Sequence, residues 1–345
     1  MKNTVVIGQL HFKKNDMIGA VVKTRNIYYG LLEKHGEKLI SYVDIWGGKK
    51  RIAIVFAEVF KAFKKCENVI LVTSAIKGSY VSYVRLLQKI FKRRVIYIPI
   101  GVRISGRIAN DSKARKRLSF CSAILPESKQ NCCELQSLGF PEVYLLRNFK
   151  SVKTLGRSYD SLHHNMTVMS FCTFSRVTKE KGITDAIIAI SRAQELVSNI
   201  RFELHIYGGI DPDYKEEFES LLKKYFFVVY EGSVNSEDAV LTLEKHDVLL
   251  FPTRFPDEGI PGTIIDAFAA GIPTISSKWL YFDEIFEDHK TALGYEYLNV
   301  DSLVDTIIYA TKNIDELINI GRNGQKEYEK YDSSAVLPVL EKQLL

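Results

Sequence analysis

Two carboxylates stand eight positions apart in the segment DEGIPGTIIDAFAAGIPT, which runs from Asp257 to Thr274. Glu258 precedes a turn rich in glycine and proline, and Asp266 lies in the apolar stretch that follows, where a helix is predicted. A helix reached through glycines presents free backbone N–H groups and a positive dipole end, which suit a phosphate. Asp266, about one turn inside this helix, could accept hydrogen bonds from ribose hydroxyls, and Glu258 could accept them from a sugar beyond the diphosphate. The spacing therefore predicts a nucleotide-sugar site.

Two cations that suit the same ligand follow an earlier strand pattern. Arg176 and Lys181 occur in FSRVTKEKG, directly after the apolar run TVMSFCTF. They would supply the fixed positive charge that a diphosphate needs and would stabilise it as a leaving group. Gly208 and Gly232 follow two further strand patterns, LHIYGG and VVYEGSV. All of these residues are expected at the carboxyl ends of strands.

Alternating strand and helix patterns would position these residues, and the alternation occurs twice along the 345 residues. Near-continuous apolar strands separated by helices predict parallel sheets that are covered on both faces. In the first half the strand patterns are TVVIGQL, KLISYVDIW, NVILVTS, RVIYIPI, SAILPES and EVYLLRNF. In the second half they are TVMSFCTF, FELHIYGG, FFVVYEGSV, DVLLFPT and PTISS. The predicted architecture is therefore two doubly wound, Rossmann-like α/β domains in series, with the ligand in the cleft between them.

The polar segment SVKTLGRSYDSLHHN, residues 151–165, has neither periodicity and is predicted to separate the domains. We expect an N-terminal acceptor-binding domain over residues 1–152 and a C-terminal domain that binds the nucleotide-sugar donor over residues 165–322. Residues 323–345 are expected to form a C-terminal segment that packs back on the N-terminal domain.

Residues 168–280 resemble the donor domain of glycosyltransferase family 4, a family of retaining enzymes with the GT-B fold. The motifs that carry the resemblance are, in order, FSRVTKEKG, LHIYGG, VVYEGSV and DVLLFPTRFPDEGIPGTIIDAFAAGIPTISS. Glu258 and Asp266 occupy the acidic positions of the family's Glu-x7-Glu motif, of which the first holds the donor sugar and the second the ribose. The resemblance also assigns Arg176 and Lys181 to the diphosphate, and it implies catalytic roles for Glu258, Arg176 and Lys181.

The first half resembles the family more loosely. Gly19, in MIGAVVKTRN, matches a glycine-rich loop that approaches the donor phosphates. The stretches RVIYIPIGVRISGRI and SAILPESKQNCCELQSLGFPEVYLLRNF are similar to acceptor domains of members that build bacterial surface polysaccharides. The resemblance implies transfer from a nucleotide-diphosphate sugar, expected to be a UDP-sugar, to a lipid-linked saccharide in capsule, exopolysaccharide or O-antigen synthesis. The donor-binding residues that it implies are Gly19, Arg176, Lys181, Gly208, Gly232, Glu258, Gly259, Ile260, Pro261, Gly262, Thr263 and Asp266.

Charge divides unevenly between the two halves. Residues 1–150 carry 28 Lys and Arg against 10 Asp and Glu, whereas residues 151–345 carry 19 against 31. An anionic membrane surface is the expected partner of the basic half, and nucleic acid is not expected, because no nucleic-acid-binding module is evident. The expected contacts are Lys92, Arg93, Arg94, Lys113, Arg115, Lys116 and Arg117.

The chain lacks both a spanning apolar run and the apolar core of a signal peptide near its start. A cytoplasmic protein bound peripherally to the inner face of the membrane is therefore predicted.

No cofactor and no essential metal are expected, because the five cysteines show no C-x-x-C and no D-x-D pair is found in a metal-binding loop. Two alternatives remain open, a nucleotide-sugar epimerase and a non-catalytic subunit that retains donor binding. A dehydrogenase is disfavoured because no G-x-G-x-x-G follows the first strand.

Overall fold

The chain folds into two compact units in a computed structural model. The N-terminal unit comprises Met1–Lys150 together with Tyr331–Leu345, and the C-terminal unit comprises Ser151–Lys330. The structure describes residues 1–12, 19–46, 51–76, 78–101, 104–111, 113–152, 156–159, 162 and 166–345. Among these residues, no helix combines the length and the apolarity needed to cross a membrane.

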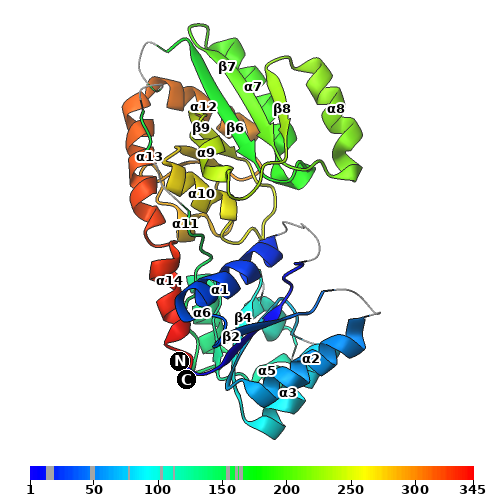
Figure 1. Ribbon diagram of the computed structural model, residues 1–345. Helices are drawn as coiled ribbons and strands as arrows, with labels where there is room; N and C mark the ends of the chain where they lie inside the picture. Colours follow the sequence, from blue (N-terminus) through cyan, green and yellow to red (C-terminus); the bar gives the residue numbers. More distant parts are fainter. Residues whose placement is uncertain are drawn as a thin grey trace. The chain divides into compact units, whose positions relative to one another are not determined.

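The N-terminal unit is built on a five-stranded parallel sheet with the order β2-β1-β3-β4-β5 (Figure 1). The strands are β1 (Thr4–Gly8), β2 (Ile40–Asp44), β3 (Asn68–Thr73), β4 (Arg94–Pro99) and β5 (Ala123–Ile124). The helices are α1 (Gly19–His35), α2 (Ile52–Lys65), α3 (Ser79–Phe91), α4 (Ile104–Ala109), α5 (Ala114–Leu118), α6 (Lys129–Ser137) and α14 (Ser333–Glu341). Because β1 and β3 are buried on both faces, helices must cover both. One core joins the sheet to α2 and α3, and the other joins it to α1 and α14.

The strand predicted over residues 142–149 is wrong. Only Val143 forms a bridge, to Ile124 at the end of β5. β5 is two residues long and is followed closely by Pro126, which has no N–H to extend a ladder. The segment instead continues beside the residues that follow β5, where Leu146 N donates to Pro126 O at 2.8 Å.

The C-terminal unit is built on a six-stranded parallel sheet with the order β11-β10-β9-β6-β7-β8. The strands are β6 (Val168–Phe174), β7 (Arg201–Tyr207), β8 (Val228–Gly232), β9 (Val248–Phe251), β10 (Thr274–Ser277) and β11 (Leu293–Tyr295). The α-helices are α7 (Ile183–Leu196), α8 (Lys215–Lys224), α9 (Ala239–Leu243), α10 (Gly262–Ala270), α11 (Phe282–Ile285), α12 (Val300–Lys312) and α13 (Ile314–Tyr328). Two 3₁₀ turns, Lys179–Lys181 and Pro212–Tyr214, precede α7 and α8. Both sheets confirm the predicted architecture of parallel α/β domains.

The strand order of the C-terminal sheet creates a switch point between β6 and β9. From β6 the chain proceeds outward through β7 to β8, and it then returns to the other side of β6 to add β9, β10 and β11. The loops that follow β6 and β9 therefore leave the same sheet edge and diverge to different helices, α7 and α10. Ligands of open α/β sheets bind at such a point, because the diverging loops leave a crevice.

The last residues of the chain belong to the N-terminal unit. Helix α13 ends at Tyr328 within the C-terminal unit, and residues 331–345 cross to the N-terminal unit. There, α14 packs on α1 so closely that a Cβ on Gly30 would overlap the side chain of Leu337. Glu341 forms an ion pair with Lys34 and a hydrogen bond with His35 Nε2. This unit is therefore assembled from two segments far apart in sequence.

Candidate active site

Lys181 and Glu258 meet at the switch point of the C-terminal sheet. Lys181 lies in the loop that follows β6, and Glu258 lies in the loop that follows β9. The Lys181 ammonium contacts Glu258 Oε2, and the two side chains are 18% and 13% exposed. A cation and a carboxylate thus share one sheltered position at the sheet edge. The ammonium group can donate hydrogen bonds to a phosphate oxygen, and the carboxylate can accept one from a sugar hydroxyl.

Hydrogen bonds to neighbouring strands hold Glu258 in place. Thr253 Oγ1 donates to Glu258 Oε2 at 3.2 Å, and the indole Nε1 of Trp279 donates to the Glu258 carbonyl at 3.0 Å. Thr253 is itself fixed because its carbonyl accepts from Ser277 Oγ, at the end of β10, at 2.9 Å. Both the backbone and the side chain of Glu258 are therefore oriented by groups from β9, β10 and the residues after them.

Two glycines allow the loops at this edge to approach one another. Gly182 has φ +69°, and a Cβ there would overlap the carbonyl oxygen of Pro252, directly after β9. Gly208 has φ +135°, and a Cβ there would overlap the carbonyl oxygen of Ser175, directly after β6. Both positions therefore require glycine for two reasons, backbone conformation and space. Gly182 brings the Lys181 loop against the Glu258 loop, and Gly208 adds the loop that follows β7.

An ion pair that the sequence analysis missed joins the same two loops. Arg254 donates to both carboxylate oxygens of Asp185 in α7, at 2.9 and 2.7 Å, and its backbone N donates to Glu180 O at 2.8 Å. The hydroxyl of Tyr297 donates to the Arg254 carbonyl. Burial raises the pKa of Tyr297, which favours the neutral donor form. No spacing rule links Arg254 to Asp185, because they lie 69 positions apart.

Helix α10 starts at Gly262, one residue before the apolar stretch in which the helix is predicted, with Pro261 before it in an extended conformation. Its first turn is tied to β6, since Thr263 Oγ1 donates to Phe174 O at 2.7 Å. The turn residue Ile260 is buried, and Gly259 is partly exposed. Asp266 lies in the second turn, among residues that are all buried, and is itself only 2% exposed. This carboxylate is thus far more sheltered than Glu258.

The remaining predicted residues lie at different places. Arg176 follows β6 with a side chain that is 69% exposed, and its nearest acid is Asp211, 4.0 Å away. Gly232 ends β8 with φ +79°, and its carbonyl accepts from Gly208 N at 2.8 Å. Gly19 is the first residue of α1 and belongs to the N-terminal unit. The structure therefore brings Lys181 and Glu258 into contact, with Arg176, Gly208 and Gly232 at the same sheet edge.

The D-x-D pattern occurs once in the sequence, as Asp211-Pro212-Asp213, and its first aspartate caps a turn. Asp211 Oδ1 accepts from Asp213 N at 3.1 Å and so caps the 3₁₀ turn that precedes α8. Within the described part of the chain, no group of three or more His, Cys, Asp or Glu is arranged to hold a metal ion.

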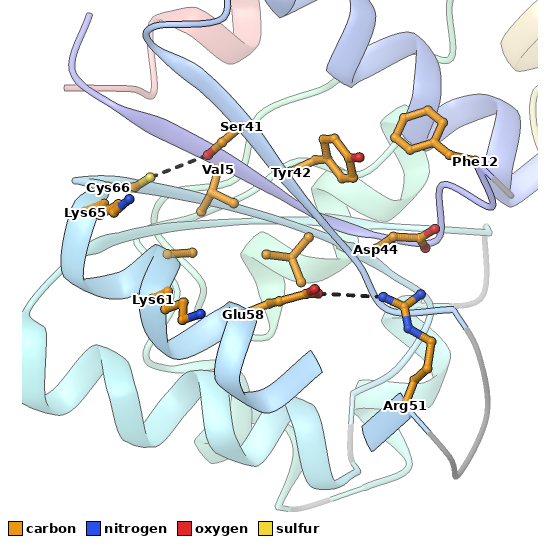
Figure 2. A pocket seen from close by; sticks show the side chains of 12 residues that line it. Val5, Phe12, Ser41, Tyr42, Asp44, Arg51, Glu58, Lys61, Lys65 and Cys66 are labelled. Atoms are coloured by element: carbon orange, nitrogen blue, oxygen red, sulfur yellow. Dashed lines mark hydrogen bonds and ion pairs between the residues drawn. The ribbon is translucent and has the colours of Figure 1, made fainter. Parts of the chain in front are cut away.

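A hollow of about 480 Å³ lies in the N-terminal unit, between the edge strand β2 and helix α2 (Figure 2). Its rim carries Tyr42 and Asp44 from β2, and Glu58 and Lys61 from α2. None of the predicted donor-binding residues lines it. Most of the predicted donor-binding residues instead lie at or near the switch point of the C-terminal sheet, which is therefore the better candidate for the donor site.

Residues 160–327 match the family model described as glycosyl transferases group 1. The fold resembles that of HepE from Anabaena in complex with UDP, with a TM-score of 0.76 at 15% identity over 99% of both chains. For HepE in complex with UDP-glucose the TM-score is 0.73 at 14% identity, again over 99% of both chains. The C-terminal unit therefore contains a glycosyltransferase group 1 domain, and the chain has the two-domain GT-B fold. Both findings support an enzyme of the glycosyltransferase class.

Curated relatives act in surface polysaccharide synthesis. WcaL of Escherichia coli K12, described as a colanic acid biosynthesis glycosyltransferase, is 24% identical over 214 residues, which are 60% of this chain and 52% of WcaL. WclY of Escherichia coli, described as an O-antigen biosynthesis glycosyltransferase, is 25% identical over 139 residues, which are 40% of this chain and 36% of WclY. The chain thus spans about half, or less, of the length of these relatives.

Proposed function

We propose that this chain is a retaining glycosyltransferase that moves a sugar from a nucleotide diphosphate, UDP, to a saccharide acceptor in surface polysaccharide synthesis. The observation that carries the proposal is the contact of Lys181 with Glu258 at the switch point of a glycosyltransferase group 1 domain. The UDP and UDP-glucose complexes of HepE, which has the same fold, support the choice of donor.

In the proposed site, each group meets the part of the donor that its chemistry suits. Lys181 and Arg176 neutralise the diphosphate as negative charge grows on it during departure, with the N-terminal amides of α10 at Gly262 and Thr263. Glu258 accepts hydrogen bonds from hydroxyls of the sugar. Asp266 holds the ribose, as the family 4 resemblance implies. Gly208, Gly232, Gly259, Ile260 and Pro261 shape the surrounding loops, and Gly19 approaches the phosphates from the N-terminal unit.

The descriptions of WcaL and WclY as colanic acid and O-antigen biosynthesis glycosyltransferases support the choice of acceptor. We infer a lipid-linked saccharide, met by the N-terminal unit at the inner face of the membrane. The excess of Lys and Arg in residues 1–150 supports this, because anionic headgroups attract basic surfaces. Retention at the anomeric carbon, metal independence and the site residues all form part of the same proposal.

The deciding experiment compares the parent chain with Glu258→Gln. First, thermal unfolding is followed with UDP, UDP-sugars, GDP-mannose and TDP-glucose, because a ligand that binds only the folded chain stabilises it by RT ln(1 + [L]/Kd) and so raises the unfolding midpoint. Transfer is then measured with the donor that stabilises the chain and lipid-linked saccharide acceptors. We expect Glu258→Gln to keep its stabilisation by UDP, because Lys181 stays in place to meet the diphosphate, and to lose at least 100-fold in transfer, because the carboxylate that meets the sugar is removed.

The control is Glu216→Gln, which removes an exposed carboxylate of α8 in the same unit. It should transfer at the parental rate. Transfer by Glu258→Gln at the parental rate would refute the assignment of Glu258 to the sugar. An epimerised donor in the absence of acceptor would favour an epimerase, and nucleotide binding without turnover would favour a non-catalytic subunit.

A further inference from the structure

Helices α2 and α3 of the N-terminal unit lie side by side against one face of its sheet (Figure 1). Their inner sides are apolar and buried, with Val55, Val59 and Phe63 in α2 and Val84 and Leu87 in α3. Two aromatic contacts join the helices, Phe56 with Tyr83 at 4.5 Å and Phe60 with Phe91 at 5.8 Å between ring centroids. The pair therefore forms one continuous layer with its own outer face.

This outer face carries several large apolar side chains. The unit exposes nine among its described residues, and five of them lie on these two helices. Ile54 (51% exposed), Phe60 (37%), Leu86 (52%) and Ile90 (61%) lie on the outer face, whereas Ile52 (47%) is the first residue of α2 and lies on the side of the buried Val55 and Val59. Leu86 and Ile90 are four positions apart in α3 and so share one side of that helix. Packing in the core of the unit does not account for these side chains, because they are exposed.

The same face is strongly basic. Lys61, Lys64 and Lys65 in α2 and Lys89 in α3 are exposed, and Lys64 lies over the ring of Phe60 at 5.1 Å. Lys92 follows α3 and is also exposed. The two helices contain one acid, Glu58, which lies 3.8 Å from Arg51 at the hollow beside β2 (Figure 2). The exposed apolar side chains are therefore surrounded by lysines, and the single acid of the two helices, Glu58, is paired with Arg51.

We propose that this α2–α3 face, formed by Ile54, Phe60, Lys61, Lys64, Lys65, Leu86, Lys89 and Ile90, binds anionic lipid bilayers by partial insertion. The isoleucine, leucine and phenylalanine side chains enter the boundary between headgroups and acyl chains, and the lysines meet lipid phosphates. Exposed apolar groups with a basic rim are the two elements that interfacial binding combines. Long lysine side chains can lie along the apolar surface while their ammonium groups stay in water.

A second copy of the same face fits poorly, because it would bring two sets of lysines together. The other basic run, residues 113–117, also lacks the apolar element. Its helix α5 buries Ala114 and Leu118, Arg117 is paired with Asp111, and the guanidinium of Arg115 lies against Gly139. Of the basic residues first expected at the membrane, Arg93 caps the end of α2 by donating to Phe63 O and Lys64 O. The structure therefore favours α2 and α3 over residues 113–117.

This inference deepens the proposed function by naming the surface that meets the membrane. It rests on the proposed function only for the reason why the protein would bind a membrane, and the binding itself can be tested without any sugar. The test is co-sedimentation of the full chain, without any sugar, with vesicles of phosphatidylcholine alone or mixed with phosphatidylglycerol. Leu86→Ser/Ile90→Ser should weaken partition into the anionic vesicles roughly tenfold, because the inserted apolar groups are lost. Lys61→Gln/Lys64→Gln/Lys89→Gln should weaken it about 100-fold at low salt, at about fivefold for each charge.

The matched controls lie in the C-terminal unit. Leu196→Ser/Phe226→Ser removes two exposed apolar side chains, and Lys215→Gln/Lys223→Gln/Lys224→Gln removes three exposed lysines of α8. Both should bind vesicles as the parent does. All variants should keep the parental stabilisation by UDP, which separates failure of the lipid surface from failure of the donor site.

Three results would overturn the proposal. One is a parent chain that does not sediment with anionic vesicles at low salt. Another is equal loss of binding in the α2–α3 variants and in their controls. The third is a dimer of the parent in sedimentation velocity that Leu86→Ser/Ile90→Ser dissociates, because the face would then be an interface between copies.

Discussion

At the scale of single residues, the two acids of the motif are held in different ways. Glu258 is partly accessible and is oriented by Thr253, Lys181 and Trp279, whereas Asp266 is 2% exposed in a helix that is otherwise apolar at its buried positions. A buried carboxylate in such surroundings is costly unless a specific interaction compensates. Asp266 therefore has either a ligand to hold or a structural bond to make, and the two roles can be separated.

We predict that Asp266→Asn weakens UDP binding by about 1–3 kcal/mol, the scale of a buried hydrogen bond to a charged group. The substitution keeps the side-chain volume and removes the charge that ribose hydroxyls would contact. Isothermal titration with UDP measures the effect, with Glu258→Gln as the control that should retain parental affinity for UDP. Parental affinity of Asp266→Asn together with a shifted unfolding midpoint would mean that Asp266 acts only within the fold.

The sequence could predict which residues lie at the sheet edge, but it could not predict how they pair. Arg176, Lys181 and Glu258 were expected there because each follows a strand pattern, and parallel strands end at a common edge. The Arg254–Asp185 pair and the support from Trp279 were missed, because they depend on the adjacency of β6, β9 and β10 in space. Gly182 was missed for the same reason, since what demands glycine there is the carbonyl of Pro252.

At the scale of elements, strands with continuous apolar runs were predicted well because burial on both faces leaves an unmistakable pattern. Residues 142–149 were predicted wrongly because they have that pattern without a partner ladder beyond Val143. Their apolar side chains, such as Leu146 and Phe149, are buried nevertheless, in the core with α1 and α14. An apolar run in the sequence thus predicts that a segment is buried. To form a strand, the segment must also have an adjacent strand with which its backbone can form a hydrogen-bonded ladder.

His246 joins three strands of the C-terminal sheet and makes this unit sensitive to pH. It directly precedes Asp247 and β9, its Nδ1 lies 2.8 Å from Ser170 Oγ in β6, and its Nε2 lies 2.9 Å from the Tyr207 hydroxyl in β7. Burial, together with nearby His205 and Arg157, lowers the pKa of His246 to about 4. Its ordinary value in an unfolded chain is about 6.5. The unfolded chain therefore takes up this proton first as the pH falls.

We predict that His246 makes no pH-dependent contribution above about pH 6.5 and destabilises the C-terminal unit as the pH falls from about 6.5 toward 4. The slope is up to about 1.4 kcal/mol for each pH unit. Urea unfolding at pH 7, 6 and 5, followed by Trp279 fluorescence in a Trp46→Phe background, measures it. His246→Gln should flatten the profile. A profile that His246→Gln does not alter would assign the slope to other groups.

At the scale of the whole molecule, the last 15 residues complete a unit that begins at residue 1. Val336, Leu337 and Leu340 are buried in one core with Ile27 and Leu31 of α1. The end of the chain is also fixed by hydrogen bonds, from Leu345 N to Asn68 Oδ1 at 2.9 Å and from Lys2 N to Leu345 O at 2.7 Å. The sequence analysis expects residues 323–345 to pack back on the N-terminal domain; the structure places residues 331–345 in that unit and leaves residues 323–330 in the C-terminal unit.

We predict that deletion of residues 331–345 destabilises the N-terminal unit by about 5–9 kcal/mol, because three buried apolar side chains each contribute about 1.5–3 kcal/mol. The C-terminal unit should keep its stability and its affinity for UDP, since it gains no part of its core from the tail. Hydrogen exchange followed by mass spectrometry resolves the two units, and faster exchange is expected in β1, β3 and β4 alone. Leu337→Ala should produce a smaller change of the same kind, about 2–5 kcal/mol. Equal loss of protection in β6, β7 and β9 would mean that the two units unfold together, and unchanged protection everywhere would mean that the tail does not stabilise the N-terminal unit.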